Sequence, residues 1–296
     1  MLKRKLKGIV KLKLIHTLLF LLRPEKKSED IKLAEKNLKS LEKSSFRTLV
    51  VYNQGSLSNV ELEDFLRQFD LECIVIGSAV NVGINVSRQQ CFQYIWDNYP
   101  DTEFISELHM DMIFTHHWED AILDFLSNND EPMMSVGIVN KRGELPYLED
   151  TKYVIPSSLE EYDSFLSGLC RDKIVHGFTH PCIHKAKILK EIGGYDARFL
   201  NGKQSFEDDS LLLGYFYYYG TKKNWYPKIN YNSVVYHAIA LQRLDLQRYD
   251  LHDNFSINLN GLIKQYGAMG LKNLIHLRNS AWHKDFFQSK INEMLK

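Results

Sequence analysis

A histidine and an aspartate stand one residue apart in the segment His109-Met110-Asp111. Residues 104–108 just before them have the apolar pattern of a buried strand. Side chains alternate across an extended chain, so His109 and Asp111 are expected to point the same way. Open α/β folds bind ligands at the carboxyl ends of their strands. The two side chains can therefore converge on one divalent cation and a diphosphate. The alternative is a polar strand end with a surface histidine and aspartate.

The first half of the chain alternates strand and helix patterns. Four strand–helix units in succession predict a mostly parallel, doubly wound sheet covered by helices, with right-handed crossovers. In one of these helices, Val60, Phe65, Leu66 and Phe69 are expected to face inward. The expected strands are 15–22, 47–52, 72–76 and 103–108, and the expected helices are 28–41, 59–69 and 86–96.

The second half of the chain is less regular. A strand is expected at 133–139, helices at 158–169 and 181–192, and a last strand at 233–237. Gly193-Gly194 would end the second of these helices. From about residue 250 the sequence becomes polar and helical. We expect a basic leader at 1–13, an α/β domain at 14–250 and a helical tail at 251–296.

Composition limits the class of protein. The chain has 296 residues, 44% of them hydrophobic, and a formal net charge of zero, so it can bury a large core and is not expected to bind nucleic acid through bulk charge. Its cysteines are scattered without a Cys-x-x-Cys pair, which predicts neither a zinc knuckle nor a disulfide framework and favours a cytoplasmic location. The apolar run near the start is too short to span a membrane.

The amino-terminal residues 1–14 interleave lysines with apolar residues, without a nearby acid. Such a segment suits docking on an anionic membrane surface, here the inner face of the membrane. A solvated basic arm that leads into the first strand explains the pattern equally well.

Four short segments follow one another along the chain in an informative order. They are Asn53-Gln54-Gly55-Ser56 after a Val-Val strand, Asn81-Val82-Gly83 followed by Arg88, His109-Met110-Asp111, and Gly193-Gly194-Tyr195-Asp196 before Glu207-Asp208. Together they resemble the motifs of family 2 glycosyltransferases, which have the nucleotide-sugar-binding fold called GT-A. The resemblance covers residues 15–243, and the order of the four segments is more specific than any one of them. It implies a GT-A-type, Rossmann-like sheet flanked by helices.

The resemblance also implies a function. Such enzymes move a hexose or N-acetylhexosamine from a nucleoside-diphosphate donor, with a UDP-sugar favoured here, to a polysaccharide, glycan or lipid-linked acceptor of the cell envelope. They invert the anomeric carbon in one displacement. Two residues depart from the family pattern: Asn53 replaces an aspartate that commonly touches the nucleobase, and His109 replaces the first aspartate of Asp-x-Asp.

By the same resemblance, Asp208 is the base that takes a proton from the acceptor, with Glu207 beside it and Asp209 as a competitor. The alternative is an acidic helix start, favoured by the helix dipole. Asp111 and His109 would hold Mn²⁺ or Mg²⁺, with His237 as a third ligand; imidazole binds Mn²⁺-like ions, although carboxylates suit both ions better.

Further residues are candidates for binding. Asn53, Asn81, Arg88 and Asp111 would contact the donor, and the planar fork of Arg88 suits a phosphate. A solvated helix residue is the alternative for Arg88. The spaced set His176, His180 and His184 suggests a second metal site, although acceptor lining or packing explains it better. Trp118 and Trp225 are candidates to stack on a sugar ring, with packing as the commoner role.

Two other functions fit these residues. The changes at Asn53 and His109 are compatible with a non-catalytic domain that binds a sugar nucleotide or serves as the partner subunit of a glycosyltransferase. A nucleotidyltransferase or nucleoside-diphosphate-sugar hydrolase on a related sheet would need no acceptor.

Overall fold

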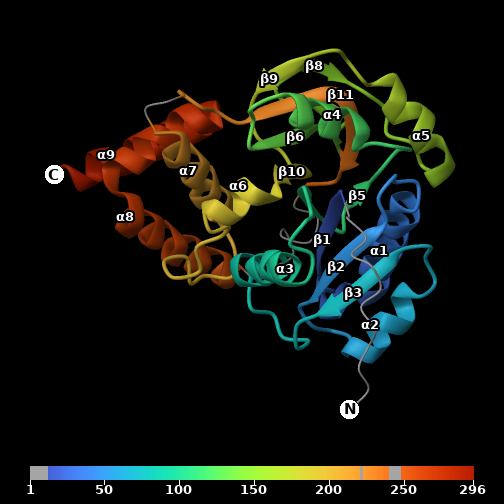
Figure 1. Ribbon diagram of the computed structural model, residues 1–296. Coiled ribbons are helices and arrows are strands. Elements are labelled where there is room, and N and C mark those ends of the chain that lie inside the picture. Colours follow the sequence, from blue (N-terminus) through green and yellow to red (C-terminus); the bar gives the residue numbers. More distant parts are fainter. Residues whose placement is uncertain (1–12, 221–222, 240–247) are drawn as a thin grey trace.

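The computed structural model describes residues 13–220, 223–239 and 248–296 (Figure 1). The predicted basic leader therefore lies outside the described residues, except for Lys13.

One large mixed sheet forms the centre of the protein. Its strand order is β3-β2-β1-β4-β10-β6-β11-β5, with β9 paired to β11. Strands β1 to β4 run parallel, whereas β10 is antiparallel to both of its neighbours, β4 and β6. The strands are β1 Leu14–Phe20, β2 Thr48–Asn53, β3 Glu72–Ile76, β4 Phe104–Leu108, β5 Met112–Ile113, β6 Met133–Asn140, β9 Ile174–His176, β10 Cys182–Lys185 and β11 Lys228–His237. A separate hairpin joins β7 Glu144–Leu145 to β8 Glu149–Lys152.

Helices cover both faces of the sheet. In Figure 1, α7, α8 and α9 lie together on one side of the molecule, far from α1 and α2. Helix α8 is interrupted at Gly267, which has a φ of 62°. The helices are α1 Lys27–Leu41, α2 Asn59–Leu66, α3 Ile84–Asn98, α4 Asp120–Asn128, α5 Leu159–Gly168, α6 Ala186–Glu191, α7 Glu207–Tyr219, α8 Arg248–Arg278 and α9 Ala281–Met294, with a short 3₁₀ turn at Pro24–Lys26.

Alternation along the strands sends neighbouring side chains into two different cores. In β2, Leu49 and Val51 pack with residues of α1, α2 and α4, whereas Val50 packs with residues of α3, α6 and α7. Burial of each such aliphatic side chain stabilises the fold by roughly 1.5–3 kcal/mol relative to an exposed position. A third cluster lies between β11 and α5. The two cores hold the sheet rigid, so that its strand ends can position polar side chains.

The predicted strands and helices of the first half are confirmed, with ends shifted by a few residues. Two details are wrong. Residues 181–192 are not one helix, because the stretch begins with β10 and only then forms α6. Val60 is 67% exposed, and Leu62 is the side chain that α2 buries instead. The polar carboxyl-terminal region is helical as expected, and the domain limits stay a prediction.

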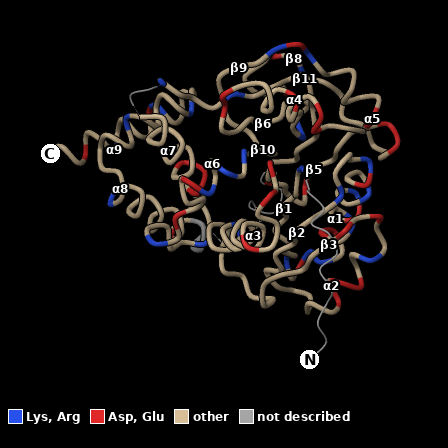
Figure 2. Tube along the Cα trace, viewed as in Figure 1, with Lys and Arg blue, Asp and Glu red and all other residues tan. Residues whose placement is uncertain are grey.

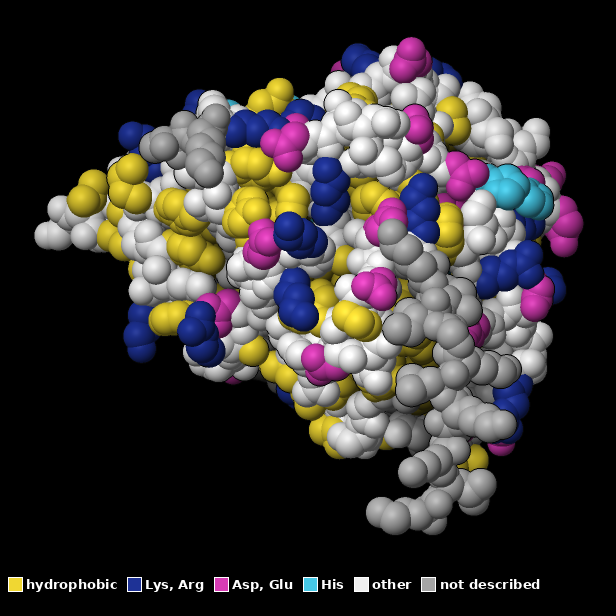
Figure 3. Space-filling view, viewed as in Figure 1, with side chains coloured by type: hydrophobic (Ala, Val, Ile, Leu, Met, Phe, Trp, Pro, Cys, Tyr) yellow, Lys and Arg dark blue, Asp and Glu magenta, His cyan; other side chains and the backbone are white. Residues whose placement is uncertain are grey.

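Basic and acidic residues are interspersed along the chain rather than separated by sign (Figure 2). In Figure 3, hydrophobic side chains gather over the part of the molecule built by α7, α8 and α9. Within the described ranges, no helix is both long and apolar enough to cross a membrane.

Candidate functional site

Strand ends place the sequence-predicted metal ligands at one edge of the sheet. His109 and Asp111 follow β4, and His237 is the last residue of β11. The two-residue strand β5 pairs with β11 so that His237 lies opposite Met112, and Ala238 N donates to Asp111 O at 3.0 Å. This pairing brings His237 beside Asp111 although 125 residues separate them in the sequence.

The three side chains form a compact donor set. His109 Nδ1 lies 3.4 Å from His237 Nε2, and His237 Nε2 lies 3.3 Å from Asp111 Oδ1. One ligand atom from each residue lies within 4.8 Å of the other two. Asp111 and His237 are both buried at 7% exposure, and His109 is half-buried. Two imidazoles and one carboxylate at this spacing fit a divalent transition ion better than Mg²⁺, which prefers oxygen ligands.

Three consecutive acids begin α7, but their environments differ. Asp209 is buried at 4% exposure, and Arg278 Nε donates to its Oδ1 at 2.7 Å. Glu207 is also buried at 4% exposure. The Asp208 side chain keeps 27% exposure, and Arg278 lies 3.9 Å from its Oδ2. Asp208 is therefore the acid of this trio that a substrate can reach.

His180 lies between Asp208 and the cluster of His109, Asp111 and His237. The sequence analysis did not predict this position. Its Nε2 lies 3.1 Å from Asp208 Oδ1, and its ring centroid lies 4.6 Å from that of His109. Burial is the largest influence on the pKa of His180 and lowers it, but the charge and hydrogen bond of Asp208, together with the charge of Glu107, raise the pKa overall. The sequence signal was the spaced set of three histidines, which does not say which one reaches the site.

The other two members of that histidine set lie elsewhere, so the second metal site suggested by the sequence does not form. His184 is fully buried, where its Nε2 contacts Glu107 Oε1 at 2.8 Å and its Nδ1 contacts Tyr215 Oη at 2.8 Å. His176 packs its ring against Tyr226, with 4.4 Å between the ring centroids.

Arg88 is a core residue. It is 1% exposed, its Nε lies 3.0 Å from Glu107 Oε2, and its terminal nitrogens donate to the Thr17 and Leu108 carbonyls. The alternative of a solvated helix residue is wrong. The guanidinium that was predicted to face a phosphate contacts protein groups instead, and its contact with a donor stays a prediction. Burial would raise the pKa of Glu107, but the His184 hydrogen bond and the Arg88 charge lower it to about 2.

The Gly-Gly-Tyr-Asp motif joins this buried network. Gly193 and Gly194 both have positive φ, and a side chain at Gly194 would come within 2.3 Å of Gln89 Oε1. The turn directs Tyr195 inward, where its hydroxyl donates to Glu107 Oε2 at 2.9 Å. The motif thus fixes the segment that leads to α7, and its contribution to the site is structural.

Asn53 is the last residue of β2, and Asn81 lies in the loop between β3 and α3. Asn53 is fully buried, and its side chain donates to Leu57 O and accepts from Gly55 N. Asn81 is half-buried and accepts from Gly83 N at 3.0 Å. Both side chains shape their own loops. Their predicted contacts with a donor stay predictions.

The two tryptophans proposed for sugar stacking are core residues. Trp118 is 1% exposed and Trp225 is fully buried, so neither offers a ring face to a ligand.

Comparison with known proteins identifies the fold. No protein-family model and no curated protein matches the sequence. Among solved structures, TarS of S. aureus matches with a TM-score of 0.54 over 90% of this chain at 13% identity. A TarS 1–349 complex with UDP gives 0.54 over 90% at 12% identity, and GalNAc-T7 with UDP, GalNAc and Mn²⁺ gives 0.53 over 76% at 11% identity.

The chain has a GT-A fold. The predicted fold class, an α/β sheet of this type, is thereby confirmed. The chain spans 43% of the TarS chain, 70% of the TarS 1–349 chain and 43% of the GalNAc-T7 chain. Membership of family 2 stays a prediction.

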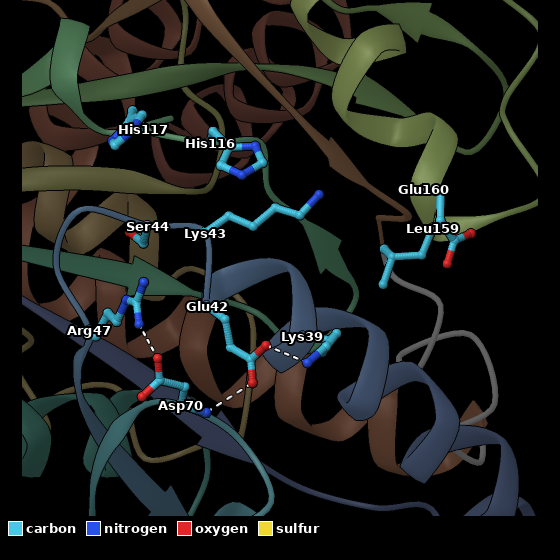
Figure 4. A pocket seen from close by; sticks show the side chains of 10 residues that line it. All are labelled: Lys39, Glu42, Lys43, Ser44, Arg47, Asp70, His116, His117, Leu159 and Glu160. Atoms are coloured by element: carbon cyan, nitrogen blue, oxygen red, sulfur yellow. Dashed lines mark hydrogen bonds and ion pairs between the residues drawn. The ribbon is translucent and has the colours of Figure 1, made fainter.

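A cavity of about 570 Å³ lies away from this site, between the end of α1, the start of β2 and the start of α5 (Figure 4). Several of its charged side chains are paired with one another: Arg47 contacts Asp70, and Lys39 Nζ lies 2.7 Å from Glu42 Oε2. His116 Nδ1 lies 2.5 Å from Asp163 Oδ2. These pairs leave the cavity without a converging set of donors.

Proposed function

We propose that this protein is a metal-dependent glycosyltransferase that uses a nucleoside-diphosphate sugar, with UDP as the favoured nucleotide. The observation that carries the proposal is the convergence of His109, Asp111 and His237 on one point, with Asp208 joined to them through His180. The GT-A fold supports it, and TarS and GalNAc-T7 of that fold are solved with UDP.

The residues divide the work of the reaction. His109, Asp111 and His237 would hold the cation, which when bound neutralises the charge that develops on the leaving diphosphate. Asp208 takes the proton from the acceptor hydroxyl as its oxygen forms a bond to the anomeric carbon. The bond from that carbon to the diphosphate breaks, and the diphosphate leaves with the electron pair. A single displacement of this kind inverts the anomeric configuration.

The finer parts of the proposal rest on the sequence resemblance. The transferred sugar is a hexose or N-acetylhexosamine, and the acceptor is a glycan or a lipid-linked glycan of the cell envelope. A cytoplasmic protein that contacts the inner face of the membrane through its amino-terminal residues would reach such an acceptor. Asn53, at the end of β2, and Asn81, in the loop before α3, are proposed to contact the nucleoside.

Thermal unfolding in the presence of sugar nucleotides tests the proposal. UDP-, GDP-, CDP- and dTDP-sugars are compared with and without Mn²⁺, because a ligand at 100 times its dissociation constant stabilises the fold by roughly 2.7 kcal/mol. We expect one nucleotide to raise Tm only when Mn²⁺ is present, and Asp111→Ala to abolish the rise. Asp163→Ala, which removes the partner of His116 beside the 570 Å³ cavity, is the matched control and should keep the rise in Tm.

The outcomes separate the alternatives. No response to any sugar nucleotide would overturn the proposal. A rise in Tm without transfer of the sugar to any acceptor or to water would favour the non-catalytic binding domain. Rapid donor hydrolysis that no acceptor accelerates would favour a hydrolase.

A further inference from the structure

We propose that His180 is a positioning residue that sets the base and the metal ligands relative to each other, through two different parts of the same residue. Its ring holds Asp208, and its main-chain carbonyl orients His237. This inference rests on the proposed function, since it assigns a role within that site.

The backbone around His180 is anchored on β6. Thr179 Oγ1 donates to Val136 O at 2.9 Å, and Thr179 N donates to Ser135 Oγ at 3.2 Å. On the other side of His180, Val136 N donates to Pro181 O at 3.0 Å. His180 is thus fixed to the sheet from both sides, so its carbonyl and its ring start from a defined position.

The ring is held by neighbours on several sides. It packs edge-on against Phe178 at 5.0 Å and tilts against His109 at 4.6 Å between centroids. Cys182 Sγ lies 3.6 Å from its Nδ1. In this orientation Nε2–H donates to Asp208 Oδ1 at 3.1 Å. The ring therefore fixes the direction of the Asp208 carboxylate, which is the more exposed acid of α7.

The carbonyl acts on the other half of the site. His237 Nδ1–H donates to His180 O at 3.2 Å. A donor at Nδ1 leaves the His237 Nε2 lone pair for a cation, and this nitrogen is the one that lies near His109 and Asp111. A hydrogen bond on the second nitrogen is the usual way in which a protein orients a metal-ligating histidine.

The two contacts predict a separation of effects. Replacement of the ring removes the Asp208 contact but keeps the carbonyl, so catalysis and metal binding should respond differently. For His180→Ala we expect kcat for UDP release from the stabilising UDP-sugar to fall about 10- to 100-fold, the range seen when supporting hydrogen bonds are lost. The affinity for Mn²⁺ in the presence of UDP, measured by electron paramagnetic resonance of the free ion, should stay within about twofold.

Two further variants control for folding. His180→Gln keeps a donor near the position of Nε2 and should recover part of kcat. His116→Ala removes an exposed histidine that lines the 570 Å³ cavity, and it should change neither kcat nor the affinity for Mn²⁺. An unchanged kcat in His180→Ala would overturn the inference. A tenfold loss of Mn²⁺ affinity would also overturn it, because the ring would then be a metal ligand.

Structures keep the inference separate from the proposed function. If the wild-type protein binds Mn²⁺ and UDP but releases no UDP from any sugar nucleotide, the proposed transfer fails. Crystal structures of wild type and His180→Ala with Mn²⁺ and UDP then decide the inference. Rotation of the Asp208 carboxylate with an unmoved His237 ring supports it, and an unmoved Asp208 contradicts it.

Discussion

Two of the places where histidines and carboxylates gather on this molecule are arranged in opposite ways. After β4 and β11, His109, Asp111 and His237 converge so that their ligand atoms lie within 4.8 Å of one another. Around the 570 Å³ cavity, by contrast, His116 faces Asp163 and Arg47 faces Asp70. The first arrangement directs its ligand atoms at a shared point, whereas the second consists of separate charge pairs.

The presence of a cavity is therefore a poor guide to chemistry in this protein. A cation or an anionic ligand needs several groups directed at one position, whereas paired surface charges contribute only about 0–1 kcal/mol each and offer little to a ligand. The cluster of His109, Asp111 and His237 is small and mostly buried, yet its three ligand atoms are directed at one position. The following tests either break this contrast or make it quantitative.

Loss of a converging ligand should have the largest effect. Asp111→Ala removes the carboxylate of this cluster, and a bound cation stabilises developing charge by several kcal/mol, so turnover should fall about 10³-fold or more. Steady-state UDP release measures this. Asp163→Ala removes a carboxylate at the cavity and should leave turnover unchanged. Equal losses in both variants would contradict the contrast.

The acids of α7 should separate by role. Asp208→Asn should lower kcat by about 10²- to 10⁴-fold while Mn²⁺-dependent stabilisation by UDP persists, because only proton transfer is lost. Asp209→Asn should instead lower the stability of the fold, since it removes the negative charge that lies 2.7 Å from the buried Arg278. Kinetics and urea unfolding on both variants distinguish the two roles, and a reversed pattern would assign the base to Asp209.

Arg88 should behave as a structural residue. Arg88→Met leaves Glu107 buried without its cation, and breaking a buried pair in this way costs roughly 3–5 kcal/mol of unfolding free energy. Urea denaturation measures the loss, and a second change, Glu107→Gln, should recover part of it. If Arg88→Met loses UDP binding at full stability, Arg88 contacts the donor directly.

The smallest effect should be a pH dependence on the face of the sheet that packs against α1. Burial lowers the pKa of His16 from 6.5 to about 4, with a partial offset from its hydrogen bond to Phe46 O. The unfolded chain therefore takes up a proton between pH 6.5 and 4 that the folded chain does not. Stability should fall by about 3 kcal/mol as pH drops through this window.

The measurement is the unfolding free energy of wild type and His16→Gln at several pH values. The wild type should lose more stability than the variant between pH 7 and pH 4.5. Parallel pH curves for the two proteins would show that His16 does not titrate in this way.

Local patterns were enough to predict most of the fold. The strands and helices from β1 to β4 follow from apolar runs and helical spacing that lie within each segment. Strand β10 was mistaken for a helix because its four residues are too few to show alternation, and its identity depends on the pairing with β4 and β6. Val60 was mistaken for a core residue because the phase of a helix of eight residues is set by its contact with the sheet.

The site was predictable in part. The sequence placed His109, Asp111, His237 and the acids of α7 in one site through a resemblance, but it could not rank those acids. Arg278, which neutralises Asp209, comes from α8, far along the chain. The role of His180 was hidden because it depends on the connection between β9 and β10, which brings this residue to His109 and His237. The sequence around Arg88 does not say whether its side chain faces solvent or Glu107. Only the burial seen in the structure decides between these two positions.

The pairing of β5 with β11 also has a consequence for the order in which the protein is made. Asp111 and His109 leave the ribosome early, whereas His237 and the strand that holds it come after three quarters of the 296 residues. A nascent chain therefore has an incomplete ligand set until the sheet is nearly finished. A cation held by all three side chains would therefore not template the early βα units, and under the proposed function its binding would be a late step that needs β11 in place.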